Sequence, residues 1–119
     1  MKESQIGIGL ILMAVVGAGQ SAAYGQVGTE SESARIATGE RVYAKHCAGC
    51  HGAHGTGDGY KLLGPDPADL TSPSIKRKSD AALLKTIHEG KPNMPSWKVR
   101  LSEDDSRDVL AYIRTLAKQ

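Results

Sequence analysis

The sequence of 119 residues contains no phenylalanine, a single tryptophan and only two cysteines, Cys47 and Cys50. Two cysteines are too few for a structural zinc site, which takes about four Cys or His ligands, usually in two pairs. A thioredoxin-like dithiol needs a strand–helix–strand context, and the sequence shows no convincing strand pattern. A disulfide between these cysteines would add little stability, because the benefit grows with the length of the closed loop.

The sequence also lacks an apolar run long enough to span a bilayer. The stretch Ile6–Ala18 has instead the length of the apolar region of a signal peptide, and small residues after it allow cleavage behind Ala23 or Gly25. An uncleaved membrane anchor is the alternative. We expect three parts: a signal peptide (1–25), a flexible polar leader (26–36) and one domain (37–119).

Aliphatic side chains are scarce in the part that remains after the leader. Residues 26–119 contain eight Leu, four Ile and four Val among 94 residues. This share lies below the roughly one-fifth at which a chain struggles to build a core, yet the helical patterning is clear. The composition therefore favours a core that is filled in part by a cofactor.

The formal net charge is only +2. Such a mild balance, without a basic helix that carries interleaved aromatic residues, does not indicate nucleic-acid binding. Basic residues do gather in the second half of the chain, at Lys76, Arg77, Lys78, Lys91 and Lys98. They form either an ordinary solvated surface or a basic region that steers an acidic partner.

The segment Cys47–His51 carries the most specific motif. Two cysteines three residues apart, followed directly by a histidine, form the attachment motif of c-type haem. If the segment is helical, Cys47 and Cys50 share a face, so each thiol can form a thioether with one vinyl group. His51 then supplies the proximal ligand of the iron.

Around this motif the chain resembles a small bacterial class I cytochrome c with one haem, similar to the haem domains of oxidases and dehydrogenases. The resemblance runs from about Ala37 to Leu116, and its segments are Gly39–Tyr43, Pro67–Leu70, Gly90–Trp97 and Ala111–Leu116. It implies an all-α fold of three to five helices wrapped around one covalently attached haem, with the N- and C-terminal helices crossing at Gly39 and Tyr43.

The resemblance also implies further site residues. Met94, held between two prolines, is expected to be the second axial ligand of the iron. The N–H of Trp97 is expected to donate to a haem propionate. A carbonyl of the Pro65–Pro67 turn is expected to accept the other ring N–H of the axial histidine, and we favour Pro65 over Pro67.

Helix boundaries can be read from caps and periodicity. The first helix is expected to begin near Ile36 or Thr38. A short helix over Ala81–Glu89 follows a cap at Ser79 or Asp80 and ends at Gly90. The last helix, Glu103–Lys118, follows a cap at Ser102. Its apolar stripe, at helical spacing, consists of Val109, Tyr112, Ile113 and Leu116.

Two further features have alternatives. His46, His54 and His88 could each bind iron, but we expect polar surface roles for them, with His88 the strongest competitor of Met94. The glycines of the segment Gly52–Gly59 could suggest a phosphate-binding loop, but the segment lacks the Gly-Lys-Ser/Thr ending. We expect an irregular loop that wraps the haem.

An iron bound by both His51 and Met94 has no position left for a substrate. The sequence therefore predicts a monomeric periplasmic electron carrier of a respiratory chain, not an enzyme. It would shuttle electrons between a donor dehydrogenase or membrane complex and a terminal oxidase or reductase, docking through the exposed haem edge and the basic residues. Alternatives are a haem subunit of a larger oxidoreductase, and a peroxidase-like or gas-binding protein with a labile Met94.

Overall fold

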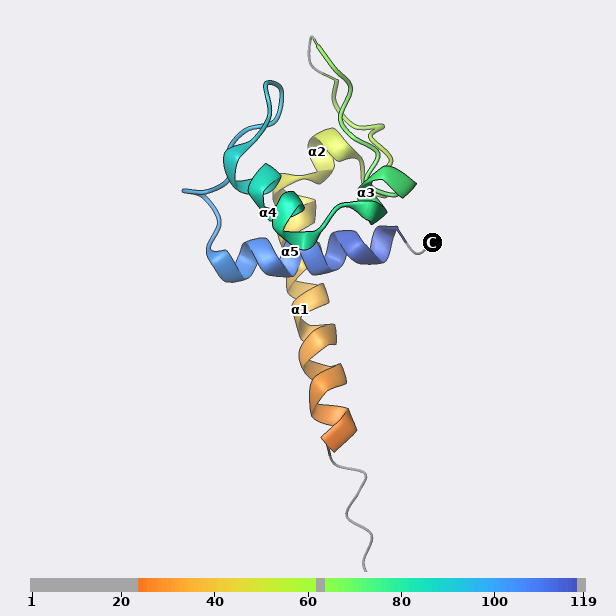
Figure 1. The fold of residues 1–119 in the computed structure, drawn as a ribbon, viewed down its shortest axis with the longest axis vertical. Coiled ribbons are helices and arrows are strands. Elements are labelled where there is room, and N and C mark those ends of the chain that lie inside the picture. The colour runs from red at the N-terminus through yellow and green to blue at the C-terminus, as the bar shows by residue number, and fades with distance from the viewer. Residues whose placement is uncertain (1–23, 62–63, 118–119) are drawn as a thin grey trace, which may run out of the picture.

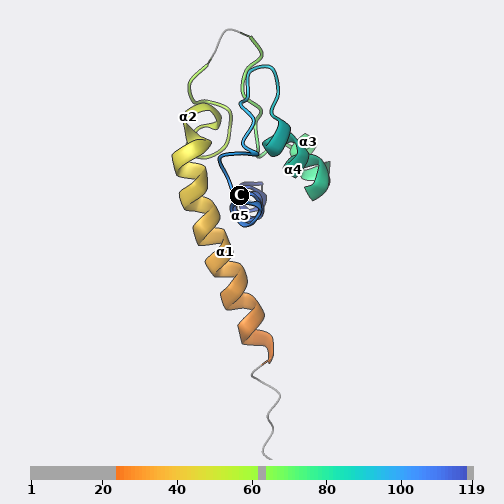
Figure 2. The same cartoon turned by 90° about the vertical axis from the view of Figure 1, so that its left-hand side faces the viewer.

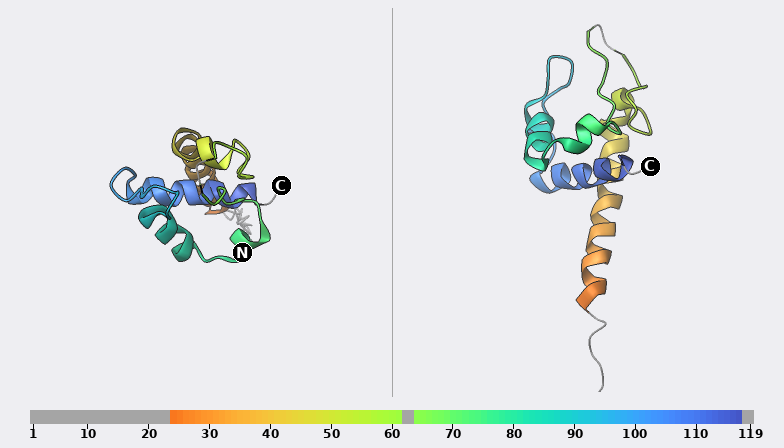
Figure 3. Two further views of the ribbon diagram at one scale, coloured as in Figure 1. Left: turned by 90° about the horizontal axis from the view of Figure 1, so that it is seen from above. Right: turned by 45° about the vertical axis from the view of Figure 1, so that its right-hand side comes forward.

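The computed structural model describes residues 24–61 and 64–117 of the protein, and within these ranges it contains five helices and no strand. The helices are α1 (Tyr24–His46), α2 (Ala48–His51), α3 (Pro73–Arg77), α4 (Asp80–Glu89) and α5 (Glu103–Leu116). α5 crosses the middle of the molecule, with α1 and α2 on one side of it and α3 and α4 on the other (Figures 1, 2 and 3). The expected all-α fold is confirmed.

The first helix starts earlier than the sequence suggests. α1 begins at Tyr24 and runs for 23 residues, so the predicted start near Ile36 or Thr38 is wrong, and residues 26–36 lie within this helix. No proline interrupts the segment. Residues 31–35 are exposed, so they carry no apolar stripe from which the helix could be predicted.

The expected signal peptide lies almost entirely outside the described residues, because the structure describes nothing before Tyr24. Among the helices that it does describe, none combines the length and the apolar character needed to cross a membrane.

The first and last helices cross at Gly39. A Cβ at this position would lie 2.5 Å from the carbonyl carbon of Asp108, so only glycine allows α5 to approach so closely. One turn later, the ring of Tyr43 packs against that of Tyr112, with centroids 5.2 Å apart. Nε of Arg35 also donates to Asp108 over 2.8 Å. The predicted crossing at a glycine and an aromatic residue is confirmed.

A glycine-rich loop, residues 52–59, folds back over α2 and satisfies its last carbonyl groups, which have no partner within the helix. The amides of Gly57, Gly59 and Tyr60 donate to the carbonyls of His51, Cys50 and Gly49, over 2.8, 3.2 and 2.6 Å respectively. A Cβ at Gly59 would lie 2.5 Å from two of these oxygens. The loop therefore needs glycine in order to lie against the helix.

Serine side chains begin the remaining three helices. The hydroxyls of Ser72, Ser79 and Ser102 accept hydrogen bonds from the amides of Ile75, Ala82 and Asp105, over 3.4, 3.1 and 3.0 Å. The predicted caps at Ser79 and Ser102 are confirmed. Gly90 ends α4 with a φ of 75°, in the region that favours glycine.

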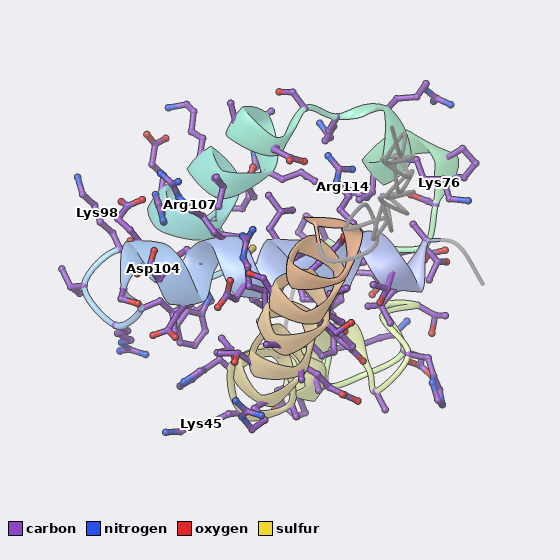
Figure 4. All side chains as sticks on the ribbon, turned by 90° about the horizontal axis from the view of Figure 1, so that it is seen from below. Lys45, Lys76, Lys98, Asp104, Arg107 and Arg114 are labelled. Carbon is purple, nitrogen blue, oxygen red and sulfur yellow. The ribbon has the colours of Figure 1, made fainter. Side chains whose placement is uncertain are left out.

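Arg114 of α5 binds the segment that connects α3 to α4 (Figure 4). Its guanidinium donates to the carbonyls of Ile75 and Lys78, over 3.2 and 2.6 Å, and to the carboxylate of Asp80 over 2.7 Å. These bonds satisfy carbonyls at the end of α3 and hold that helix in place against α5.

The apolar core consists of two clusters of buried side chains. The larger contains Tyr43, Leu70, Ile87, Val109, Ile113 and Leu116, and the smaller contains Ile75, Leu83 and Leu110. Members of both clusters line one cavity of about 600 Å³. The functional site is built around this cavity.

Candidate haem site

The cavity brings together all the site residues that the sequence predicts. Its lining includes Cys47, Cys50, His51, Pro65, Met94 and Trp97. These residues come from three parts of the chain: the α1–α2 junction, the loop after residue 64, and the loop between α4 and α5. Its volume lies within the roughly 300–1,000 Å³ of pockets that hold organic ligands, and much of its wall is aliphatic.

The two cysteines lie at the junction of α1 and α2. α1 ends at His46, and Cys47 adopts a helical conformation that is slightly opened (φ −116°, ψ −38°) before α2 continues. The motif thus lies on a helix that is interrupted at Cys47, but the amide of Cys50 still donates to the carbonyl of Cys47 over 3.2 Å. Burial, assisted by the nearby Cys50, raises the pKa of the Cys47 thiol to about 11.

His51 ends α2 and is fixed through one of its two ring nitrogens. Nδ1 lies 2.9 Å from the carbonyl oxygen of Ala68. Because a carbonyl can only accept, the ring must donate through Nδ1–H, and Nε2 is left as the basic nitrogen. A hydrogen bond of this kind fixes the ring and raises the basicity of a metal-bound imidazole.

The prediction that Pro65 supplies this carbonyl is wrong, and Pro67 does not supply it either. The carbonyl of Pro67 faces Gly57 instead, where a Cβ would lie only 2.5 Å from its oxygen. The next carbonyl along the extended chain, that of Ala68, therefore points to His51. Pro65 and Pro67 remain part of the cavity wall.

Met94 is half-buried and packs against the larger core cluster. Its loop is held by two backbone hydrogen bonds with Lys91, one in each direction, of 2.9 and 3.0 Å. The amide of Trp97 donates to the carbonyl of Ile87 in α4 over 3.1 Å. The hydroxyl of Ser96 donates to the carbonyl of His88 in the same helix. The side chain of Met94 therefore projects from a loop that is anchored to α4.

His46 departs from the expected surface role. It is half-buried and lines the cavity, because α1 ends at this residue and the chain turns. The centroid of its ring lies 5.0 Å from that of the Trp97 ring. The guanidinium carbon of Arg100 lies 5.6 Å from the centroid of the same Trp97 ring. His54 is exposed, and neither it nor His88 lines the cavity.

The basic residues do not form one continuous group. Lys78 and Lys91 line the cavity, whereas Lys76 and Lys98 lie near opposite ends of α5 (Figure 4). All four of these lysines are exposed, as is Arg77. Only the two cavity lysines are thus placed by the structure at the candidate haem site.

The residues present fit a haem. A covalently held porphyrin requires two thiols, a histidine whose Nε2 can bind the iron and an apolar cavity, and this cavity is lined by members of both core clusters. Fold and site together define a small all-α haem protein with thioether attachment.

Comparison with known proteins specifies this class further. Residues 34–113 match the family described as cytochrome C oxidase, cbb3-type, subunit III. The cytochrome c6 of Synechocystis sp. is 31% identical in an alignment of 97 residues that covers 78% of this chain and 75% of the relative. A cytochrome c6-like protein of Nostoc sp. is 33% identical over 81 residues, 68% of this chain and 70% of its own.

The cbb3-type cytochrome c oxidase subunit CcoP of Cereibacter sphaeroides is 30% identical over 99 residues, 75% of this chain but only 30% of that subunit. The chain therefore belongs to the matched family and is a class I c-type cytochrome with one haem. It is a haem electron carrier or an oxidase subunit, its haem c is covalently attached, and its partners are redox proteins.

Proposed function

We propose that the protein is an exported, monomeric one-electron carrier whose haem iron is bound axially by His51 and Met94. The observation that carries this proposal is that both side chains line the same cavity, each on a segment anchored by backbone hydrogen bonds. The haem, when bound, supplies a metal that cycles between ferric and ferrous states. Two axial side chains leave no open position, so transfer of an electron is favoured over chemistry at the metal.

The chain's own residues set the properties of the site. The Nδ1–H bond of His51 to Ala68 raises the basicity of the coordinating nitrogen, while a thioether ligand such as Met94 raises the reduction potential. Trp97 lines the cavity, and its indole N–H is proposed to donate to a propionate. Cys47 and Cys50 hold the macrocycle, so that its position changes little between the two redox states.

The proposed route starts with export, for which residues 1–25 serve as a signal peptide or an uncleaved anchor, and residues 37–119 then fold as the cytochrome domain. The carrier takes electrons from a donor dehydrogenase or membrane complex and passes them to a terminal oxidase or reductase. Docking is proposed at the cavity rim, where Lys78 and Lys91 attract an acidic partner surface. Lys76, Arg77 and Lys98 add longer-range steering.

An absorption spectrum of the protein produced with haem maturation tests the proposal. We expect a low-spin haem with a methionine–iron charge-transfer band in the ferric state. Carbon monoxide should leave the ferrous spectrum unchanged, because the sixth position is filled. Rapid binding of carbon monoxide would contradict axial ligation by Met94 and would direct attention to peroxide turnover or gas binding.

A second candidate function is a haem subunit of a larger oxidoreductase. It is favoured by the match to the subunit III family and by the similarity to CcoP, of which the chain spans 30%. Gentle purification of the tagged protein from its native source separates the two candidates. Co-purification of an oxidase or dehydrogenase in fixed stoichiometry supports the subunit, whereas recovery of a single small haem protein supports the free carrier.

A further inference from the structure

Tyr43 makes a second contact besides its role at the helix crossing. Its hydroxyl donates a buried hydrogen bond of 2.7 Å to the carbonyl oxygen of Gly52. Tyr43 lies in α1, one turn before Cys47, whereas Gly52 directly follows His51. The bond therefore joins the helix that leads into the haem motif to the first residue after that motif.

Gly52 is the point where the chain leaves α2. Its amide donates to the carbonyl of Ala48 over 2.9 Å, which closes the last turn of the helix. Its φ of 83° then directs the chain into the glycine-rich loop. A hydrogen bond to the carbonyl of Gly52 therefore fixes both the end of α2 and the direction in which His51 is presented.

The surroundings of this hydroxyl allow no easy replacement of the bond by water. The Tyr43 side chain is 1% exposed, and a Cβ at Gly55 would lie 3.5 Å from its oxygen, so the loop packs directly over it. Burial, followed by the influence of Cys47, raises the pKa of Tyr43 far above its usual value. The hydroxyl therefore remains a proton donor throughout the physiological pH range.

His51 is thus held from two sides: its ring is bound by the carbonyl of Ala68, and the backbone of the next residue, Gly52, is bound by Tyr43. We propose that Tyr43 is a positioning residue for the axial histidine: its bond to Gly52 keeps α2 where the His51 ring can donate to Ala68. This inference rests on the proposed function, since it takes His51 as an iron ligand. It assigns the buried tyrosine a role at the haem in addition to helix packing.

The test compares Tyr43→Phe with Tyr112→Phe in the haem-loaded protein. Both substitutions remove one hydroxyl from the same ring pair, but the half-buried Tyr112 hydroxyl makes no hydrogen bond with a described residue. The first readout is the rate at which the ring N–H of His51 exchanges with deuterated water, followed by NMR in the ferrous state. The second readout is the reduction potential.

We expect Tyr43→Phe to accelerate the exchange by about tenfold or more, because a weaker hold on α2 lets the bond to Ala68 open more often. The potential should rise, since a weaker Nδ1–H bond makes the imidazole a poorer donor to ferric iron. Tyr112→Phe should change neither quantity.

Equal exchange rates and potentials in the two variants would overturn the inference, even if Tyr43→Phe lowered the melting temperature. The wild-type spectrum separates this failure from that of the proposed function. If the wild type shows a low-spin haem bound by histidine and methionine, only the role of Tyr43 is rejected. If it does not, the proposed ligation itself is wrong.

Discussion

The backbone carbonyl of Asp108 occupies the space in which Gly39 would carry a Cβ, at the crossing of α1 and α5. No side chain can be placed at Gly39 without contact with this carbonyl, and the Cβ of Tyr112 closes the same space at 3.0 Å. The close approach of α1 and α5 therefore requires that residue 39 has no Cβ.

Gly39→Ala should therefore destabilise the protein, although alanine favours helices over glycine. Separating two packed helices costs about 1–3 kcal/mol, more than the roughly 0.5–1 kcal/mol that alanine gains within a helix. Denaturant unfolding measures the difference. Gly49→Ala provides the control, because a Cβ there meets nothing within 4 Å; equal stabilities of the two variants would show that the crossing tolerates a side chain.

Arg114→Lys should also destabilise the protein, by about 1–3 kcal/mol. An ammonium group cannot reproduce the planar set of bonds to Ile75, Lys78 and Asp80. The ion pair alone contributes little, because the Asp80 side chain is 70% exposed, so the lost bonds to the carbonyls dominate. Arg107→Lys on the same helix is the matched control, and thermal unfolding of both variants should show a loss for Arg114→Lys alone.

Stability at acid pH should depend on Asp69, which follows Ala68. Its Oδ1 accepts hydrogen bonds from the hydroxyl and the amide of Thr71, over 2.6 and 2.8 Å, and these bonds lower the pKa of the carboxylate. A lowered pKa means that the ionised group stabilises the fold above its ordinary pKa of about 4. This contribution is lost as the pH falls through the lower pKa of the folded state.

Asp69→Asn should accordingly flatten the dependence of the unfolding free energy on pH as the pH falls below about 5. The exposed Asp66, changed to Asn, provides a control for the loss of one negative charge in the same loop. An unchanged slope in Asp69→Asn would show that this turn does not contribute to the acid sensitivity of the protein.

Met94→Ala should open the sixth position of the iron, allow carbon monoxide to bind and lower the reduction potential by roughly 0.1 V or more, within the roughly 0.8 V that axial ligands span. Met94→His separates the two effects, because a second imidazole should lower the potential while still excluding carbon monoxide. Potentials that match the wild type in both variants would identify Met94 as a packing residue.

Lys78→Gln and Lys91→Gln should slow association with an acidic redox partner at low ionic strength and weaken its dependence on salt. Stopped-flow electron transfer measures both effects. Lys45→Gln removes the same charge from an exposed position that does not line the cavity and should have the smaller effect. If the three variants react alike, docking does not depend on charge at the cavity rim.

The sequence predicts those parts of the fold that side-chain patterns determine. The stripe of α5 and the serine caps of α4 and α5 follow from residue type and spacing. The crossing of the first and last helices at Gly39 and Tyr43 is implied by the resemblance to the family. The motif at Cys47–His51 similarly indicates the cofactor, because thioether attachment needs these residue types at this spacing.

The remaining features depend on contacts between residues that are far apart in the sequence, and a local sequence pattern does not reveal such contacts. The partner of His51 is a backbone carbonyl, and alanine at position 68 gives no indication of where that carbonyl points. Arg114 reaches residues more than thirty positions away. The early start of α1 is not predictable in this way, because an exposed helical segment has no apolar face.

The lining of one cavity by members of both core clusters has a consequence for the order of assembly. The crossing of α1 and α5 can form from polypeptide alone, because its contacts are between side chains and backbone. Members of both clusters, by contrast, also line the cavity in which a porphyrin would lie. We therefore expect haem attachment and completion of the core to be coupled, because the apolar side chains that line the cavity lose their contact with water only when the porphyrin covers them.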